Sequence, residues 1–486
     1  MTERQNEFRA PVAEAMKAYA GDGALAFHTP GHKQGLGAHA LLRELITPQG
    51  LREEVSLMEE LDDLHEPTMC IKEAQDLAAE LYGADAAYFM INGTSGAIHT
   101  MIMGCLKPGD KVLVPRNAHR SMIGGLILAG VTPVFIQPRI DEKLGIPMGL
   151  VLADIVAAAD AHPEAKALLL VYPTYYGVTI DLAEVAEFVH SRKMLLLVDE
   201  AHGPHLKFSD RLPLQALDAG ADMAAQSTHK ILGSMTQTSI LLVRSGRVDL
   251  ERVRSAASLL QSTSPNQLLL ASLDIARLQM AEQGPELVNR AVQLAERLRQ
   301  RVNEIPGLWS FGKEYLPVCE GLDLTKVTVS VRGLGITGVQ AEHILRHEYK
   351  IQCELSDAYN LLFIISYADT EEQAAVLERA LRGLAAQFAG RQELTLPVEI
   401  PLVPAEGISP RKAFFGGRET VDFEAAAGRI AAEQIMFYPP GIPILAPGDV
   451  IDAEALYYIR TMQRLGLKVV GPADSSLKTI QVVEEI

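Results

Sequence analysis

The tetrapeptide Ser227-Thr228-His229-Lys230 follows a short apolar run, Met223-Ala224-Ala225, and precedes a predicted apolar strand at Ile240–Val243. A lysine between two strands of a buried sheet can be a solvated loop cation, a phosphate anchor or an amine kept for imine chemistry. Considered alone, the solvated cation is the commonest case, because most lysines are exposed. The neighbouring stretches of sequence are needed to decide between these interpretations.

Two stretches upstream of Lys230 favour imine chemistry. The stretch 194–203 begins with an apolar run, Met194–Val198, that ends at Asp199, and a carboxylate at the end of a buried parallel strand lies where open α/β sheets bind ligands. The loop Asn92-Gly93-Thr94-Ser95-Gly96 joins a predicted strand to a predicted helix, which is typical of an anion cradle. A phosphate cradle, a buried acid and such a lysine together predict a pyridoxal-phosphate site. There the acid pairs with the pyridinium nitrogen and Lys230 forms the Schiff base.

Seven short apolar runs alternate with helical stretches in the first half of the chain. Continuous apolar runs separated by helices indicate a mostly parallel sheet that is covered on both faces. The runs are Tyr88–Ile91, Val112–Val114, Val134–Ile136, Leu168–Val171, Leu195–Val198, Met223–Ala225 and Ile240–Val243. The pattern therefore predicts an α/β fold with a sheet of about seven strands.

The 486 residues exceed one ordinary hydrophobic core, so we expect more than one domain. The expected parts are an N-terminal arm (1–26), a cofactor-binding large domain (27–305), a small α/β domain (306–396) and a C-terminal domain (397–486). The last part begins with a proline-punctuated linker, Pro397–Pro404.

Charge and cysteine usage limit the possible partners. Lys and Arg number 44 against 61 Asp and Glu, and the net charge of −17 argues against nucleic acid and anionic membrane partners. The four cysteines are Cys70, Cys105, Cys319 and Cys353. Their wide spacing argues against a disulfide framework or a zinc site, and no apolar run approaches the length of a membrane span. We expect a cytoplasmic protein with no metal site.

A second motif suggests a different class of enzyme. Residues 333–338 read Gly-Leu-Gly-Ile-Thr-Gly, a literal GxGxxG, and Glu354 lies 21 residues beyond the first glycine. This spacing would suit a dinucleotide-dependent oxidoreductase. However, only two further predicted strands follow before the linker, and this function would leave Lys230 and Asp199 without roles. The alternative explanation is a tight glycine turn. A non-catalytic binding protein would likewise leave Lys230 unexplained.

Taken in order, the motifs resemble the fold-type I pyridoxal-phosphate enzymes. More narrowly, the sequence is similar to the ornithine/lysine/arginine decarboxylase group of bacteria, over nearly the whole chain. The motifs that carry the resemblance are Phe27–Lys33, Asn92–Gly96, Asn117–Ser121, Asp199–Gly203, Ser227–Lys230, Ser264-Pro265, Ala413-Phe414-Phe415 and Pro439–Pro443.

The resemblance implies roles for the residues around the cofactor ring. Lys230 carries the cofactor, and Asp199 holds its ring nitrogen protonated. His119 stacks on the pyridine ring, and Ala201 lies against the other face. His202 is counted among the cofactor-binding residues, although it stands where the family resemblance suggests an aromatic residue, so we expect the local packing to differ.

The resemblance also implies a phosphate site that two subunits share. The residues implied in one chain are Thr94, Ser95, Gly96, Ser227 and His229. A hydroxyl from Ser262–Ser264 of a partner subunit joins them, with Ser264 as our choice, because this fold builds its sites at a dimer interface. No receiver-like domain precedes Phe27–Lys33, which favours the short form of the group and a homodimer with shared sites over a large ring.

The implied activity is α-decarboxylation of a basic amino acid. We expect arginine, giving agmatine, with lysine (cadaverine) or ornithine (putrescine) as alternatives and aminotransferase chemistry on the same fold as the next. A buried cationic side chain needs an anionic partner. The candidate acids are Glu354 and Asp357, with Asp62 or Asp63 of a partner subunit as further choices.

Overall fold

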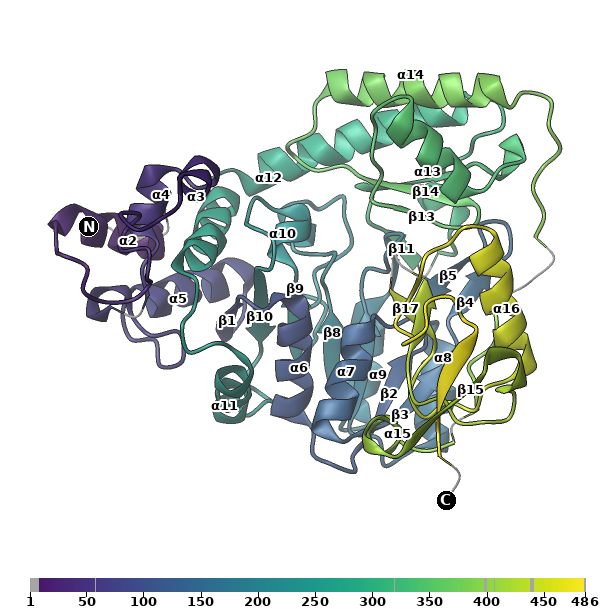
Figure 1. Cartoon of the computed structure of the whole chain (residues 1–486), viewed down its shortest axis with the longest axis horizontal. Coiled ribbons are helices and arrows are strands. Elements are labelled where there is room, and N and C mark those ends of the chain that lie inside the picture. The colour runs from purple at the N-terminus through teal and green to yellow at the C-terminus, as the bar shows by residue number, and fades with distance from the viewer. Residues whose placement is uncertain are drawn as a thin grey trace. The chain divides into compact units, whose positions relative to one another are not determined.

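The computed structural model describes residues 8–56, 58–318, 320–396, 400–405, 407–437 and 441–484 (Figure 1). Cys319, Pro397 at the start of the expected linker, and Pro439 and Pro440 of the Pro439–Pro443 motif lie outside the described residues. Among the helices that the structure describes, none is both long enough and apolar enough to cross a membrane.

The largest sheet has seven strands in the order β1-β10-β9-β8-β6-β2-β3. Their bounds are β1 (Ala86–Met90), β2 (Lys111–Pro115), β3 (Thr132–Ile136), β6 (Ala167–Val171), β8 (Leu195–Asp199), β9 (Met223–Gln226) and β10 (Ser239–Val243). β2 runs parallel to β3 and β6, and β8 runs parallel to β9, whereas β10 is antiparallel to both β9 and β1. Each of the seven predicted apolar runs forms one of these strands, so the prediction of a mostly parallel α/β sheet is confirmed.

The chain divides into two compact units, which are described separately. Unit 1 comprises residues 1–105, 197–208 and 215–286, and unit 2 comprises residues 106–196, 209–214 and 287–486. In unit 1, helix α6 packs on β1, β9 and β10. The helices of unit 1 are α2 (Pro11–Asp22), α3 (Ala40–Leu45), α4 (Pro48–Glu53), α5 (Cys70–Tyr82), α6 (Gly93–Cys105), α10 (Thr228–Ile231) and α11 (Leu250–Leu260). Helix α12 (Gln267–Asn303) begins in unit 1 and ends in unit 2.

Unit 2 adds a small three-stranded sheet, β12-β14-β13, covered by helices α13 and α14. The helices of unit 2 are α7 (Arg120–Ala129), α8 (Leu152–Ala161), α9 (Leu182–Ser191), α13 (Gly338–His347), α14 (Glu371–Gln387), α15 (Pro410–Phe415) and α16 (Ala453–Arg464). Its further strands are β4 (Arg139–Asp141), β5 (Ile146–Gly149), β7 (Val178–Ile180), β11 (Glu320–Leu322), β12 (Lys326–Ser330), β13 (Leu355–Ser356), β14 (Asn360–Ile364), β15 (Arg418–Asp422), β16 (Ile435–Phe437), β17 (Ile442–Leu445), β18 (Val469–Val470) and β19 (Thr479–Val483).

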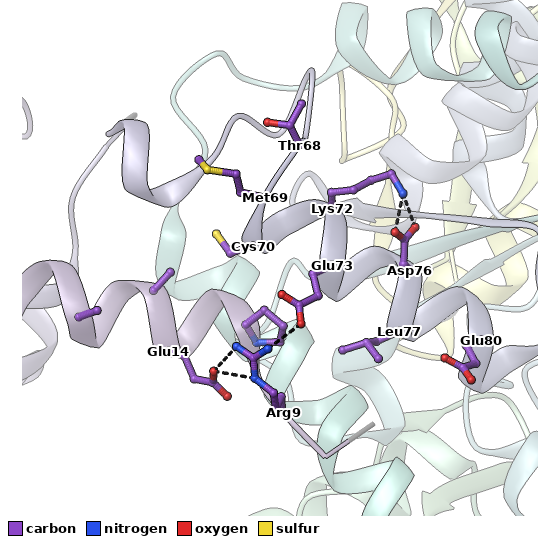
Figure 2. A pocket seen from close by; sticks show the side chains of 13 residues that line it. Arg9, Glu14, Thr68, Met69, Cys70, Lys72, Glu73, Asp76, Leu77 and Glu80 are labelled. Carbon is purple, nitrogen blue, oxygen red and sulfur yellow. Dashed lines mark hydrogen bonds and ion pairs between the residues drawn. The ribbon is translucent and has the colours of Figure 1, made fainter. Parts of the chain in front are cut away.

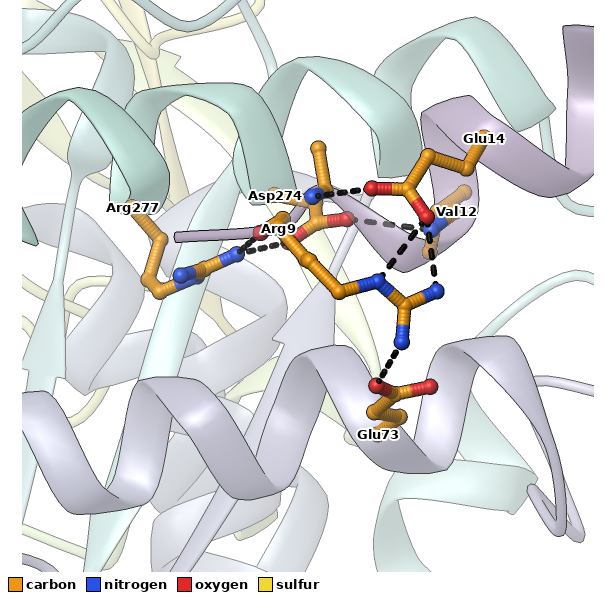
Figure 3. Close-up of polar contacts among 7 residues, drawn as sticks. Arg9, Val12, Glu14, Glu73, Asp274 and Arg277 are labelled. Carbon is orange, nitrogen blue, oxygen red and sulfur yellow. Dashed lines mark hydrogen bonds and ion pairs between the residues drawn. The ribbon is translucent and has the colours of Figure 1, made fainter. Parts of the chain in front are cut away.

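A buried ion pair anchors the N-terminal arm within unit 1 (Figure 3). Asp274 and Arg277 are separated by one turn of α12, and a guanidinium nitrogen of Arg277 lies 2.7 Å from Oδ1 of Asp274. Both side chains are at most 1% exposed. The N–H of Val12, in the first turn of α2, donates a hydrogen bond of 3.0 Å to Asp274 Oδ2. Arg277 donates a second hydrogen bond to the carbonyl of Arg9. The arm is therefore fixed by charged groups that have no access to water, which makes its position specific.

A cavity of about 680 Å³ lies between α2 and α5 (Figure 2). Its charged groups are largely paired with one another: Arg9 binds Glu14 and Glu73, and Lys72 binds Asp76. Arg9 therefore connects Glu14 of α2 with Glu73 of α5, whereas Lys72 and Asp76 form an ion pair within α5.

Asp62 supports helix α5 from outside the helix. Its carboxylate accepts hydrogen bonds of 2.8–3.3 Å from the N–H groups of Asp63, Thr68, Met69, Ile71 and Lys72. Burial opposes ionisation, but these N–H donors outweigh it and lower the pKa of Asp62 below its ordinary value of 3.8. We therefore assign Asp62 to capping this helix start rather than to substrate binding.

Replacing Asp62 by alanine is expected to lower the free energy of unfolding by about 2–4 kcal/mol, because it removes the acceptor of one buried and four part-buried N–H groups. Asparagine, which keeps one acceptor oxygen and loses the charge, should cost roughly half as much. Since the folded-state pKa is lowered, this stabilisation is present at neutral pH and is lost as the pH falls through that lowered value. Thermal melting of both variants at pH 7 checks the prediction, and an unchanged melting temperature for Asp62→Ala would contradict it.

Candidate active site

Lys230 sits on a four-residue helix, α10, directly after the buried strand β9. Its amine Nζ lies 2.9 Å from Nε2 of His202, which is itself only 5% exposed. A buried imidazole at this distance can exchange a proton with the amine. The structure thus brings together two of the predicted cofactor-binding residues, and it places the lysine where its protonation can be controlled.

Asp199 ends strand β8 and is 5% exposed. Its Oδ1 accepts the N–H of Ala201 at 3.1 Å. Burial raises the pKa of the Asp199 carboxyl, while the charge of Lys230 and the Ala201 N–H oppose the rise. A buried acid in this state is stabilised as a carboxylate by a further cation, and the protonated ring nitrogen of pyridoxal phosphate is such a group.

The predicted anion cradle is the first turn of α6. Gly93, at φ +74°, opens this helix, and a Cβ added there would meet no atom of the described residues within 4 Å. Ser95 in the same turn is exposed. Gly96 is required for another reason, because its Cβ would lie 2.0 Å from the Asn92 side chain. An open helix start with N–H groups and a free-standing hydroxyl suits a phosphate, so the residues present fit the cofactor.

A chain of hydroxyl groups fixes how Thr94 can act. Ser239 Oγ donates to the Gln226 carbonyl at 2.6 Å, which uses its only proton. Thr94 Oγ1 must therefore donate to Ser239 Oγ, at 3.0 Å. The Thr94 hydroxyl is thereby committed to β10, which leaves its backbone N–H as the group that Thr94 can offer to an anion.

His229 and Ser227 line the start of α10. His229 Nδ1 lies 2.8 Å from the Thr238 carbonyl, so this nitrogen carries a proton. Burial lowers the pKa of His229, the Thr238 carbonyl opposes this, and Lys230 adds to the lowering. In a neutral ring Nε2 is a hydrogen-bond acceptor and cannot donate to a phosphate. A direct contact therefore requires that the negative charge of the phosphate raises the pKa of His229 enough for the ring to take up a proton. Ser227 is fully buried beside it.

Sequence reasoning missed the loop between α10 and β10. Thr238 holds His229, Ser239 holds Thr94, and Gln237 donates to the Ile91 carbonyl at 2.6 Å. The signal that could have found it is the density of hydroxyl and amide side chains in Ser234-Met235-Thr236-Gln237-Thr238-Ser239, directly after the lysine.

The remaining predicted residues have their own surroundings. Ser264, in unit 1, is exposed just before α12. In unit 2, His119 follows β2 and caps α7, and its Nδ1 accepts the N–H of Ser121 at 3.2 Å. This contact leaves the proton of a neutral ring on Nε2 and fixes the ring orientation.

The two candidate substrate acids in unit 2 differ in character. Glu354 is exposed, and its Oε1 accepts from the Tyr175 hydroxyl at 2.7 Å. Asp357 accepts from the Tyr176 hydroxyl at 2.7 Å and from the N–H groups of Tyr359 and Asn360 at 2.8 Å each. Burial raises the pKa of Asp357, and these donors oppose the rise. Asp357 thus holds the turn between β13 and β14, whereas Glu354 is the more accessible of the two.

Local packing explains the GxGxxG motif. A Cβ on Gly333 would lie 2.7 Å from the Gly307 carbonyl, and one on Gly338 would lie 2.2 Å from the Asn360 carbonyl. Gly335 adopts φ +66°, which favours glycine. Thr337 caps helix α13 together with Gln340 in a capping box. The motif is the tight strand-to-helix turn, so nothing in it requires a dinucleotide.

Comparisons with known proteins identify relatives over almost the entire chain. Residues 10–321 match the Orn/Lys/Arg decarboxylase major domain, and residues 401–473 match the C-terminal domain of the same family. An arginine decarboxylase of Bacillus anthracis is 46% identical over 99% of both chains, and one of Bacillus subtilis is 44% identical over 99% of both. The crystal structure of a lysine decarboxylase from Francisella novicida has a TM-score of 0.85 at 22% identity, and the match covers 99% of this chain and 82% of that one. At this identity the structural match supports the fold alone.

Proposed function

The chain belongs to the Orn/Lys/Arg decarboxylase family, and on that premise we propose that it decarboxylates arginine to agmatine with bound pyridoxal phosphate. The observation that carries the choice of arginine is the 44–47% identity to four arginine decarboxylases, over 91–99% of this chain. Lysine is the second candidate, since lysine decarboxylases of Escherichia coli are 24–25% identical over 92–95% of the chain.

In the proposed mechanism, the bound cofactor supplies an electron sink for the electron pair released when the α-carboxylate leaves. Lys230 is the attachment point, and His202 Nε2, at 2.9 Å, takes the ammonium proton so that the amine can act as a nucleophile. The same pair can return a proton to the substrate α-carbon. Asp199 provides the negative charge that keeps the ring nitrogen protonated.

The remaining residues hold the cofactor and substrate in this proposal. The first turn of α6, with the Thr94 and Ser95 N–H groups and the Ser95 hydroxyl, binds the phosphate. Gly96 leaves room for Asn92, and Ser227 and His229 complete the cradle. For His119 and Ala201, the roles against the two ring faces rest on the family resemblance. His119 is pre-oriented by its contact with Ser121.

Borohydride reduction of the holoenzyme should fix one cofactor per chain on Lys230, as peptide mapping would reveal. The same preparation should turn over arginine at least roughly tenfold faster, in kcat/KM, than lysine or ornithine. A label on another residue would overturn the assignment of Lys230. Faster turnover of lysine would overturn the choice of substrate and leave the mechanism standing.

Glu354 is our first proposal for the acid that binds the substrate side chain, with Asp357 second. A planar guanidinium prefers a bidentate carboxylate, and Glu354 is exposed enough to offer one. Glu354→Gln should raise KM for arginine about tenfold or more with a smaller change in kcat. The matched control is Glu393→Gln, an exposed acid paired with Arg332. An unchanged KM in Glu354→Gln would remove Glu354 from the site.

We further propose a homodimer with shared active sites. Large apolar side chains of the N-terminal segment are exposed in the single chain: Leu25, Phe27, Leu36 and Leu45 are each 82–93% exposed. Exposed apolar area of this kind marks an interaction surface. The acidic composition and the four separated cysteines support a cytoplasmic location.

Complementation tests the shared site. A Lys230→Ala chain and a Ser264→Ala chain should each be weakly active alone. Co-expressed under two affinity tags, they should form a mixed dimer that regains activity, because one of its two sites receives no substituted residue. Mixed dimers without regained activity would show that Ser264 acts within its own chain or not at all.

A further inference from the structure

Gln237 has a backbone conformation that glutamine rarely adopts. Its φ is +85°, in the left-handed region where a side chain costs free energy that glycine avoids. A chain that required only a turn at this point would be served better by glycine. The position therefore raises the question of what the side chain contributes.

The side chain and the backbone of Gln237 both form hydrogen bonds to the same loop. Its Nε2 donates to the Ile91 carbonyl at 2.6 Å, and its own carbonyl accepts the N–H of Gly93 at 2.9 Å. Ile91 and Gly93 bracket Asn92 at the start of α6. Gln261 Oε1 in turn accepts the Ile91 N–H at 3.0 Å. Two glutamines thus fix the loop that forms the anion cradle.

The loop that carries Gln237 is also tied to the lysine. The next residue, Thr238, accepts from His229, the neighbour of Lys230, and Ser239 accepts from Thr94 in the first turn of α6. Thr238 Oγ1 further donates to the Met235 carbonyl at 2.6 Å. The segment 235–239, which we call the brace, is therefore hydrogen-bonded both to the helix that carries Lys230 and to the first turn of α6.

We propose that Gln237 is a positioning residue that holds the phosphate-binding first turn of α6 at a fixed place relative to Lys230. The inference rests on the proposed cofactor. The aldehyde of pyridoxal phosphate and the methylene that bears its phosphate are attached to neighbouring ring carbons, so one cofactor can reach both groups only when the cradle and the lysine amine lie a set distance apart. If the hydrogen bonds of Gln237 are lost, this spacing is no longer fixed. Binding of the complete cofactor then weakens, although the lysine amine and the N–H groups of the cradle are themselves unchanged.

Three substitutions separate the contribution of the side chain from that of the turn. Gln237→Glu keeps the length and loses the donor to Ile91, and Gln237→Asn tolerates positive φ but is one methylene too short. Gln237→Gly relieves the backbone strain and removes the side chain. Lys193→Gly is the matched control, because Lys193 is an exposed non-glycine residue at φ +59° outside the proposed site.

The full-length protein, stripped of cofactor, is titrated with pyridoxal phosphate and with pyridoxal, which lacks the phosphate, and the absorbance is followed. All three Gln237 variants should raise the Kd for pyridoxal phosphate by roughly fivefold or more, the equivalent of one lost hydrogen bond, and leave the Kd for pyridoxal unchanged. Gln237→Gly should melt at the wild-type temperature or above, and Lys193→Gly should bind both ligands like wild type.

Two results would overturn the inference. One is a Kd for pyridoxal phosphate in Gln237→Glu and Gln237→Gly within twofold of wild type. The other is an equal weakening for both ligands, which would place the effect at the lysine rather than at the phosphate. A wild-type protein that gives no absorbance change with either ligand would instead refute the proposed cofactor, so the two failures are distinguishable.

Discussion

Replacing Asp199 by asparagine is expected to lower kcat for arginine by about a thousandfold or more. The substitution keeps the shape of the side chain and the acceptor for the Ala201 N–H but removes the negative charge. In the proposed mechanism this charge would keep the ring nitrogen of the cofactor protonated, and its loss would make the ring a weaker electron acceptor. A thousandfold loss corresponds to about 4 kcal/mol of transition-state stabilisation, within the range of other preorganised electrostatic groups.

The fold should tolerate this change. Since burial raises the pKa of Asp199, the charge opposes folding, and its removal should leave the melting temperature unchanged or higher. The matched control is Asp181→Asn, which alters an acid that caps helix α9 through the Glu184 N–H, and its kcat should stay near that of wild type. Single-turnover rates of both variants measure the loss of activity, and their cofactor absorbance shows whether each variant still binds the cofactor. A kcat in Asp199→Asn within tenfold of wild type would rule out the charge as the active feature.

The second large effect concerns Glu200, the residue after Asp199. Its side chain is fully buried, with Oε1 accepting the Ala216 N–H at 2.7 Å and Oε2 accepting from Gln226 Nε2 at 2.8 Å. Burial raises the pKa of Glu200 to about 8, against which the Gln226 and Ala216 donors act, while Asp218 adds to the rise. Burial raises the pKa of the nearby Tyr82 phenol, and the charge of Glu200 raises the Tyr82 pKa further.

The raised pKa makes the protein sensitive to alkaline conditions. The contribution of Glu200 to stability is fully present below the ordinary pKa of 4.5 and is lost as the pH rises towards about 8. Over this span the loss amounts to about 5 kcal/mol. Glu200→Gln has no such proton to lose, so its advantage over wild type in free energy of unfolding should grow between about pH 5 and pH 8 and level off towards pH 9. Melting curves of both proteins across this range check the prediction, and a constant difference between them would contradict it.

Asp199 and Glu200 also illustrate what the sequence can predict. Seven apolar runs marked all seven strands of the main sheet, because a buried parallel strand needs apolar side chains on both faces, and that requirement is visible in five consecutive residues. The same runs placed Asp199 at a strand end and Lys230 after another. They did not reveal that the adjacent acid, Glu200, points into the interior toward Gln226.

Local patterns in a characteristic order were therefore enough to predict the family and to place Lys230 directly after a buried strand. The tertiary structure alone decided which polar groups hold these patterns in place. Asp62 was a candidate for substrate binding until its carboxylate proved to be engaged by five N–H groups around the start of α5. Nothing in the sequence pointed to Gln237, because its partner, Ile91, is 146 residues away. A hydrogen bond across such a separation leaves no periodicity or spacing in the chain, since it exists only after the strands between the two residues have assembled.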